Sequence, residues 1–242
     1  VVPNSFATMQ DLVSWYGAPD DWDCQVIHWG VDTGMFVPPH RDSEDVVHRH
    51  DEIRSRFSIP QDSLFILAVG RLAARKGNGF LLRSFAKLVE STDANLLIIG
   101  RGGLRRKLIR MAYRLGIGDR VSIESSMNFQ EVSEMYRVAD LVVYPSYYEG
   151  QGLIPLEAMS SGTPVVTVNH GPLPEMVDET VGALFEMGSV ESFSEAIVSE
   201  SSSKSALLEK GERGRSRVMD KFTLEHNAND FLDVYKRAIS NS

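Results

Sequence analysis

The chain has 242 residues, a mass of 26.9 kDa and a formal net charge of −8. Hydrophobic residues make up 43% and charged residues 24% of it, which is typical of a globular protein and excludes a disordered or fibrous one. The acidic balance argues against general nucleic-acid binding, which needs a basic surface. The single cysteine, Cys24, excludes a disulfide framework and a zinc site built from cysteines. The apolar runs are much shorter than the roughly 20 residues of a membrane-spanning helix.

The first fifty residues differ in pattern from the rest of the chain. Residues 6–16 predict a helix, residues 25–28 a short strand, and the sequence WGVDTGMF a turn. Residues 38–51 are polar, contain a Pro-Pro pair and mix both charges, so we interpret them as a linker.

From residue 64 onward, short apolar runs alternate with amphipathic segments. Strands are predicted at 64–70, 95–100, 121–124, 140–145, 163–168 and 181–186. Helices are predicted between them at 80–90, 104–115, 130–138 and 152–161, and after them at 190–200, 205–221 and 223–239. This alternation predicts an α/β fold with a doubly wound parallel sheet, Rossmann-like, with helices on both faces.

Two polar, glycine-rich loops that follow strands are expected to face each other. In an open parallel sheet, ligands bind outside the carboxyl ends of the strands, at the point where the strand order reverses. In the usual order this point lies between the first and fourth strands. Those strands lead into GRLAARKG (70–77) and PSYYEGQGLIPLE (145–157), so we expect a ligand site there.

The first loop places two cations, Arg71 and Lys76, between Gly70 and Gly77. An arginine fork and a lysine point charge together match the charge of a diphosphate. Each cation considered alone is equally well explained as a solvated loop residue.

The second loop leads into a helix whose start is marked by Gly150, Gly152 and a proline in the first turn. Free backbone amides from Gly152 through Leu153 to Ile154 can hold phosphate oxygens with the help of the helix dipole.

Two acidic residues belong to the same loop and helix. Glu157 can accept hydrogen bonds from two neighbouring ribose hydroxyls, and Glu149 would reach the other side of the phosphates. The plainer alternatives are an acid favoured by the helix dipole for Glu157 and a solvated loop acid for Glu149. Four charged residues on two facing loops are harder to explain in that way.

These motifs carry a family resemblance that spans nearly the whole chain. EGQGLIPLEAMSSGTPVV resembles the glutamate-x7-glutamate signature of retaining GT-B glycosyltransferases of family 4, and GRLAARKG resembles their donor-phosphate loop. VVPNSFATMQDLVSWYG and QVIHWGVDTGMFVP resemble the crossing between the two domains of that family, HGPLPEMV a glycine-containing loop, and FTLEHNANDFLDVYKRAI the C-terminal return helix.

The resemblance implies transfer of a sugar from a UDP-, GDP- or ADP-sugar to a saccharide, lipid or small-molecule acceptor, with retained anomeric configuration. It implies no metal and no cofactor, because the nucleotide sugar is a substrate. By match, Arg71 and Lys76 would stabilise the leaving diphosphate, and Glu157 would bind ribose. Glu149 would contact the sugar hydroxyls and support the transition state.

The sequence departs from the family pattern in several places. Gln151 stands where an aromatic residue is common, and Trp29 where an asparagine usually precedes Gly-Val-Asp. GRGG (100–103) replaces the usual Gly-x-Gly-Pro and is also only a weak dinucleotide signal. ESSMNF (124–129) lacks an expected glycine, which leaves the nucleotide base open.

GT-B enzymes have two Rossmann-like domains, and the first holds most of the acceptor site. We therefore predict that this chain is the donor-binding half, which binds nucleotide sugar but turns over little without the missing N-terminal domain. The predicted division is a remnant of that domain with the crossing at 1–37, a linker at 38–58, the donor-binding domain at 59–222 and the return helix at 223–242.

Two other functions stay open at this point. One is a nucleotide-sugar 2-epimerase of the same architecture, and the other is a non-catalytic nucleotide-binding module. We expect a cytoplasmic location. The basic amphipathic residues 105–114 predict a solvated face, with peripheral contact to an anionic membrane as the alternative.

Overall fold

Residues 1–17, 23–39, 44–125 and 127–240 are described by a computed structural model. Within these residues, six parallel strands form one sheet. They are β1 (Leu64–Val69), β2 (Ala94–Ile99), β3 (Val121–Glu124), β4 (Leu141–Tyr144), β5 (Val165–Val168) and β6 (Gly182–Phe185). All six predicted strands of this part of the chain are thereby confirmed.

The strand order is β3-β2-β1-β4-β5-β6, so the order reverses between β1 and β4. Ile66 of β1 lies opposite Leu141 of β4 in the parallel register. Every residue of β2, β4 and β5 is buried, because helices cover both faces of a doubly wound sheet. The fold class is therefore as predicted, with the first and fourth strands side by side.

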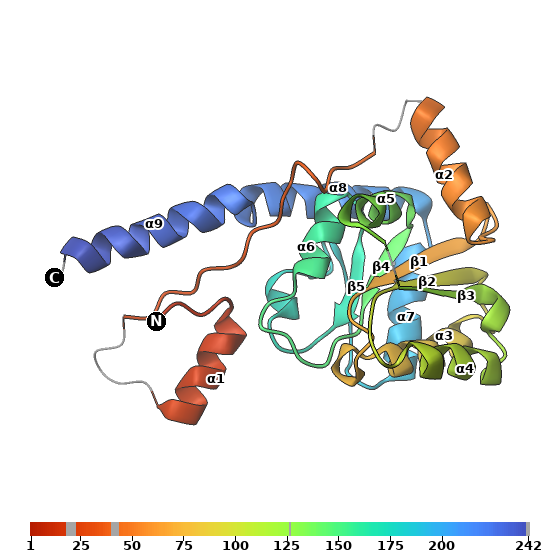
Figure 1. The fold of residues 1–242 in the computed structure, drawn as a ribbon, viewed down its shortest axis with the longest axis horizontal. Helices are drawn as coiled ribbons and strands as arrows, with labels where there is room; N and C mark the ends of the chain where they lie inside the picture. Colours follow the sequence, from red (N-terminus) through yellow and green to blue (C-terminus); the bar gives the residue numbers. More distant parts are fainter. Residues whose placement is uncertain (18–22, 40–43, 126, 241–242) are drawn as a thin grey trace.

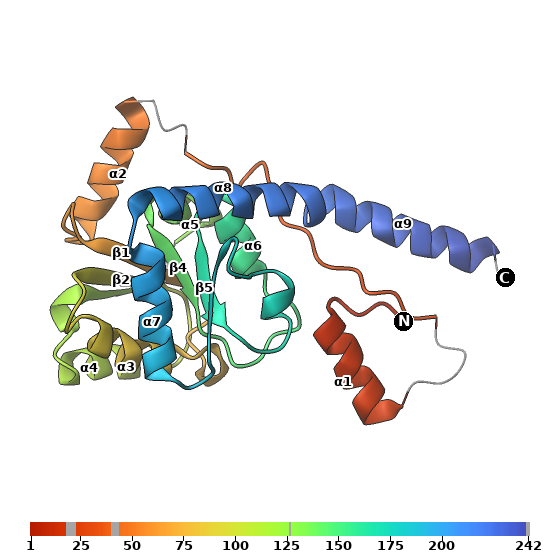
Figure 2. The same cartoon turned by 180° about the vertical axis from the view of Figure 1, so that it is seen from behind.

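The helices form a layer on each face of the sheet (Figures 1 and 2). One layer contains α3, α4 and α7, and the other contains α5 and α6, with α8 packed on α6. The bounds are α3 (Asn78–Leu88), α4 (Arg105–Arg114), α5 (Phe129–Val138), α6 (Leu153–Ser160), α7 (Val190–Ser201) and α8 (Lys204–Lys221). Short 3₁₀ turns occur at Ala74–Lys76, Gly118–Arg120 and Leu173–Glu175.

The predicted linker at 38–58 is largely a helix, α2 (Glu44–Arg56), and residues 40–43 lie outside the described part of the chain. Ile53 packs into the hydrophobic core with 2% exposure. The guanidinium of Arg54, also buried, forms an ion pair with Asp140 at 2.7 Å and donates to the carbonyl of Ser63 at 2.9 Å. The polar composition of residues 38–58 suggested a linker, but the buried side chain of Arg54 binds α2 to the residues just before β1 and β4.

The short strand predicted at 25–28 is also absent, because this segment has no neighbouring strand to pair with along its length. Instead the amides of Gln25 and Ile27 donate to the carbonyls of Val1 and Pro3 at 3.1 and 3.0 Å. Only Val31, further on, makes a single bridge, to Thr223.

The first and last helices reach away from the sheet (Figure 1). Neither α1 (Phe6–Tyr16) nor α9 (Leu224–Ser240) has a buried residue in the described structure. The front segment runs beside the start of α9, where the side chain of Asn227 donates to the carbonyl of His28 at 2.8 Å. Over the described residues, no helix combines the length and apolar character needed to cross a membrane.

Candidate functional site

The loops that follow β1 and β4 touch each other. The amide of Tyr147 donates to the carbonyl of Arg75 at 2.8 Å, and the Arg75 guanidinium donates to the carbonyl of Tyr148 at 3.0 Å. Gly77 has φ +70°, and a Cβ atom there would lie 2.0 Å from the carbonyl oxygen of Pro145. Only glycine allows this approach, so its position in the first loop is what lets the second loop close against it.

Lys76 and Glu149 form an ion pair where the two loops meet. The Lys76 Nζ contacts Glu149 Oε1 and donates to the hydroxyl of Tyr144 at 2.8 Å. That hydroxyl donates in turn to Glu149 Oε1 at 2.7 Å, and the Ser146 hydroxyl donates to the same oxygen. The lysine and glutamate side chains are only 12% and 10% exposed, so the pair is largely shielded from water.

The surroundings of Glu149 and Tyr144 set the protonation state of each. Burial alone would raise the pKa of Glu149, but hydrogen bonds from Lys76, Ser146 and Tyr144 outweigh it and hold the pKa below its usual value. Burial and the neighbouring carboxylate raise the pKa of Tyr144 far above its usual value. The site therefore holds a charged carboxylate and a neutral phenol beside a lysine.

Arg71 lies at the start of the same loop, with an exposed side chain. Its guanidinium makes no hydrogen bond or ion pair with the part of the chain that the structure describes, while its carbonyl accepts from the amide of Ala73 at 2.9 Å. The predicted pair of cations thus consists of an exposed arginine and a lysine already bound to Glu149.

The amino end of α6 is open for a ligand. Gly152 is its N-cap residue, with φ +100°, and no side chain caps the helix there. Side chains cap α1, α5, α7 and α8, whereas α3 and α4 resemble α6 in having no side-chain cap. The first amides of α6, at Leu153 and Ile154, have no partner within the helix and can donate hydrogen bonds to an anion.

Glu157 lies one turn into α6, where the hydroxyl of Tyr136 donates to its Oε2 at 2.8 Å. Burial raises the pKa of Glu157, and this hydrogen bond offsets only part of the effect. Its Oε1 has no hydrogen bond with the described residues, so this carboxylate can accept hydrogen bonds from a ligand's hydroxyl groups.

A match to a family model agrees with this geometry. The model described as "Glycosyl transferases group 1" matches residues 49–217, well over half of the chain. The chain belongs to the group 1 glycosyltransferases. It is 33% identical over 246 aligned residues to a D-inositol 3-phosphate glycosyltransferase of Mycolicibacterium smegmatis, an alignment that covers 99% of this chain and 53% of that protein. The chain thus spans about half the length of the curated relatives it matches.

Solved structures of GT-B glycosyltransferases share the fold. A sucrose-phosphate synthase from Thermosynechococcus elongatus has a TM-score of 0.85 and 25% identity, covering 100% of this chain and 59% of that one. The Anabaena protein HepE, in complex with UDP-glucose, has a TM-score of 0.84 and 18% identity, covering 98% and 63% of the two chains. This group 1 glycosyltransferase chain therefore has the fold of one half of a GT-B enzyme.

Sequence reasoning missed the side chains that organise the two glutamates. In this group 1 glycosyltransferase, Tyr144 and Ser146 bind Glu149, and Tyr136 binds Glu157. Tyr144 ends an apolar strand and Tyr136 lies on the buried face of α5, which explains why they look like ordinary core residues. The only available signal was that Tyr144 ends its strand beside the polar loop.

A second missed feature joins the front segment to the site. Glu175 accepts from the first amides of α1, those of Phe6 and Ala7, at 3.0 and 2.8 Å, and its Oε2 lies 2.9 Å from His28 Nε2. The Thr8 hydroxyl donates to the carbonyl of Gly150 at 3.1 Å. The loop that precedes α6 is therefore in direct contact with α1.

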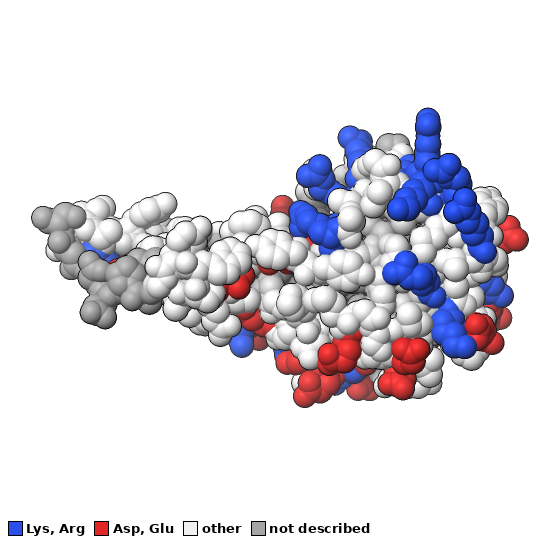
Figure 3. Space-filling model, turned by 90° about the horizontal axis from the view of Figure 1, so that it is seen from below, with Lys and Arg blue, Asp and Glu red and all other residues white. Residues whose placement is uncertain are grey.

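Charge is distributed unevenly over the group 1 chain despite its acidic total. Seen from below, Lys and Arg gather on one side of the body and Asp and Glu along the other (Figure 3). Helix α4, at the lower edge of Figure 1, carries five cations in its sequence: Arg105, Arg106, Lys107, Arg110 and Arg114. No cluster of three or more His, Cys, Asp or Glu side chains suited to a metal ion occurs among the described residues.

Proposed function

We propose that this chain is the donor-binding half of a retaining glycosyltransferase that uses a nucleotide-diphospho-sugar, and that the diphosphate lies between the loops after β1 and β4. The observation that carries the proposal is the contact between Lys76 of one loop and Glu149 of the other. Family membership and the open amino end of α6 support it.

The diphosphate would be held by charge and by backbone amides. Arg71 offers a free guanidinium and Lys76 an ammonium, while Gly152, Leu153 and Ile154 offer amides at the positive end of α6. These groups are fixed before the reaction, so they would stabilise the charge that develops on the departing diphosphate without a metal ion. Removal of one such donor typically lowers turnover by about 10²–10³.

The two glutamates would bind the two ends of the donor. Glu157 would accept hydrogen bonds from the ribose hydroxyls through the carboxylate oxygen that Tyr136 leaves unpaired. Glu149 would contact the sugar hydroxyls near Gly150 and support the positive charge that forms at the anomeric carbon. Its lowered pKa keeps it ionised for this purpose.

The named complexes of similar proteins suggest which compounds to test first. HepE is solved with UDP-glucose, so a UDP-sugar is our first choice of donor, with GDP- and ADP-sugars as the alternatives. A relative is named for D-inositol 3-phosphate, so we propose a polyol phosphate as the first acceptor among saccharide, lipid and small-molecule classes. We infer that transfer to an acceptor needs the N-terminal half that the relatives have in addition.

Calorimetric titration of the chain with UDP, GDP, ADP and their sugars tests the proposal. We expect saturable binding of one nucleotide and its sugar, unchanged after addition of EDTA. Absence of binding for all of them up to millimolar concentration would contradict a donor site, and loss of binding on chelation would contradict the role of the fixed cations.

A further inference from the structure

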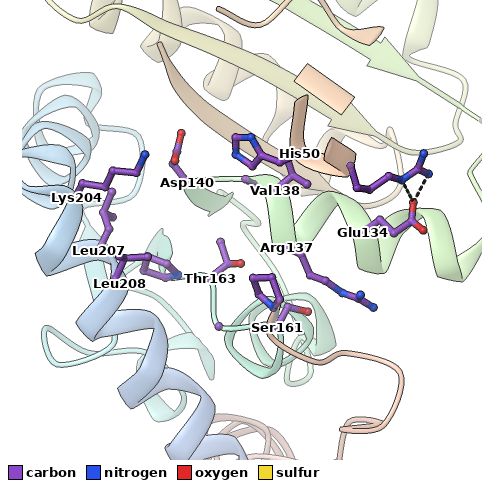
Figure 4. A pocket seen from close by; sticks show the side chains of 15 residues that line it. His50, Glu134, Arg137, Val138, Asp140, Ser161, Thr163, Lys204, Leu207 and Leu208 are labelled. Atoms are coloured by element: carbon purple, nitrogen blue, oxygen red, sulfur yellow. Dashed lines mark hydrogen bonds and ion pairs between the residues drawn. The ribbon is translucent and has the colours of Figure 1, made fainter. Parts of the chain in front are cut away.

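A second pocket lies at the other edge of the sheet, where β4 and β5 begin (Figure 4). Its volume is about 420 Å³, within the range of small-molecule sites. It is bounded by α2, α5, α8 and the turn from α6 into β5. The donor loops follow the carboxyl ends of the strands, whereas this pocket lies at their amino ends. The two places are therefore separated by the length of the strands.

Much of the wall is apolar. Val138 at the end of α5, Pro164 before β5, and Leu207 and Leu208 on α8 line it. Leu208 is 40% exposed although it faces a pocket, so apolar surface here remains open to water. An apolar group that fills the pocket would gain free energy by removing this surface from water.

The charged groups of the pocket do not cancel. Glu134 pairs with Arg49 at 2.5 Å, as Figure 4 shows, and Asp140 pairs with the buried Arg54 at 2.7 Å. Each acid of the wall therefore has an arginine partner, and Arg49 pairs in addition with Glu52 at 2.9 Å.

Two cations remain. Lys204, on α8, lies across the pocket from the Arg49–Glu134 pair (Figure 4), and it makes no ion pair or hydrogen bond with the described residues. Arg137, on α5, donates to the hydroxyl of Ser133 at 3.2 Å and to no other described residue. Burial lowers the pKa of His50 and favours its neutral form, so this histidine adds no charge to the pocket. Among the described residues that line the pocket, the cations Arg49, Arg137 and Lys204 thus outnumber the acids Glu134 and Asp140.

Unused hydrogen-bonding atoms lie in the same wall. Ser161 is 1% exposed, and its hydroxyl has no partner in the described structure. The Nε of Arg137 is likewise buried without a partner. Unpaired buried polar groups are uncommon in native proteins, and a polar ligand or ordered water is the usual explanation.

We propose that this pocket binds a small anionic amphiphile, a molecule with a phosphate or carboxylate head group and an apolar body. The head group pairs with Lys204, and the apolar body packs against Leu207, Leu208 and Val138. The ligand leaves the donor loops free, because the two sites lie at opposite ends of the strands.

The experiment uses octyl phosphate and octanoate below their micellar concentrations, titrated into the chain by calorimetry and by amide NMR. We expect a single site whose shifted amides belong to residues 137–140, 161–163 and 204–208. Octyl glucoside lacks the charge and inorganic phosphate lacks the apolar body, so each should bind at least about tenfold more weakly, the effect of roughly 1.4 kcal/mol. A comparison of octyl phosphate with octanoate identifies the preferred head group.

Two variants locate the site. Lys204→Glu reverses an exposed charge and should weaken octyl phosphate binding about fivefold or more, whereas Lys221→Glu at the other end of α8 should leave it unchanged. Leu208→Trp should obstruct the pocket at an exposed helical position that tolerates bulk. Saturating UDP should not displace octyl phosphate. Equal binding of octyl glucoside, shifts confined to other residues, or wild-type affinity in both variants would overturn the proposal.

Discussion

The side-chain amide of Gln151 and the backbone of Trp29 exchange two hydrogen bonds. The Trp29 amide donates to Gln151 Oε1 at 2.6 Å, and Gln151 Nε2 donates to the Trp29 carbonyl at 3.1 Å. Gln151 is 1% exposed, so water does not compete for either bond. A residue of the loop before α6 thereby fixes the front segment, at two positions where the sequence departs from the family pattern.

This relationship predicts the effect of Gln151→Leu. The variant leaves the amide and carbonyl of Trp29 without partners, and a buried unpaired polar group costs about 1–3 kcal/mol. We expect a decrease of that size in the free energy of unfolding, measured in urea. We also expect weaker UDP binding by calorimetry, because the loop before α6 loses a support.

Gln10→Leu provides the matched control, since Gln10 is exposed on α1 and has no hydrogen bond in the described structure. Its effect on stability should stay within about 0.5 kcal/mol. If Gln151→Leu were as stable as the control and bound UDP equally well, the two hydrogen bonds would have no role in holding the loop.

Glu157→Gln should stabilise the chain at neutral pH and weaken donor binding. The folded-state pKa of Glu157 lies above its usual value, so this group favours folding at low pH, and the contribution is lost as the pH rises through the raised pKa. A neutral glutamine avoids the cost of burying the charge and can still accept from Tyr136. Urea unfolding at pH 7 measures the gain, and calorimetry with a UDP-sugar measures the loss of the ribose acceptor. A less stable variant with unchanged affinity would contradict both roles.

Glu149 predicts the opposite dependence on pH. Its folded-state pKa lies below the usual 4.5, so its stabilising contribution is present above that value and is lost as the pH falls through the lowered pKa. The wild-type chain should therefore lose more stability than Glu149→Gln between about pH 5.5 and about pH 2.5. Parallel urea unfolding curves for the two proteins across that range would show that the ion pair with Lys76 contributes nothing.

Local sequence patterns predicted the sheet because its strands are continuous apolar runs between amphipathic helices, and burial on both faces leaves little choice of structure. They failed for α2 because its polar sequence hides one buried contact, between Arg54 and Asp140, that joins residues far apart in the chain. They failed at 25–28 because a strand needs a neighbour, and local pattern does not say whether one is present.

The same distinction applies to the site. Lys76 and Glu149 stand out because charged residues on two loops that are expected to face each other are hard to explain together as solvated side chains, and the structure brings the two into contact. Tyr144 and Tyr136 could not be recognised from the sequence, because a buried tyrosine looks like an ordinary core residue. Their hydrogen bonds to carboxylates are known only from the structure. The roles of Arg71, Lys76, Glu149 and Glu157 toward a donor stay predictions.

Substitutions of Lys76 and Glu149, the two members of the ion pair, should change the affinity for UDP in opposite directions. Lys76→Ala removes a cation from the proposed diphosphate site and should weaken UDP binding by about 1.5–3 kcal/mol, the range for hydrogen bonds to charged groups. Glu149→Gln removes a negative charge that competes for the lysine and repels the phosphates, so it should strengthen UDP binding by about 1 kcal/mol. Calorimetry on both variants measures these changes, and thermal unfolding verifies that each is folded. Lys221→Ala, which removes an exposed lysine from the end of α8, should bind UDP as the wild type does. If Lys76→Ala bound UDP with unchanged affinity, the diphosphate would not lie between the loops that follow β1 and β4.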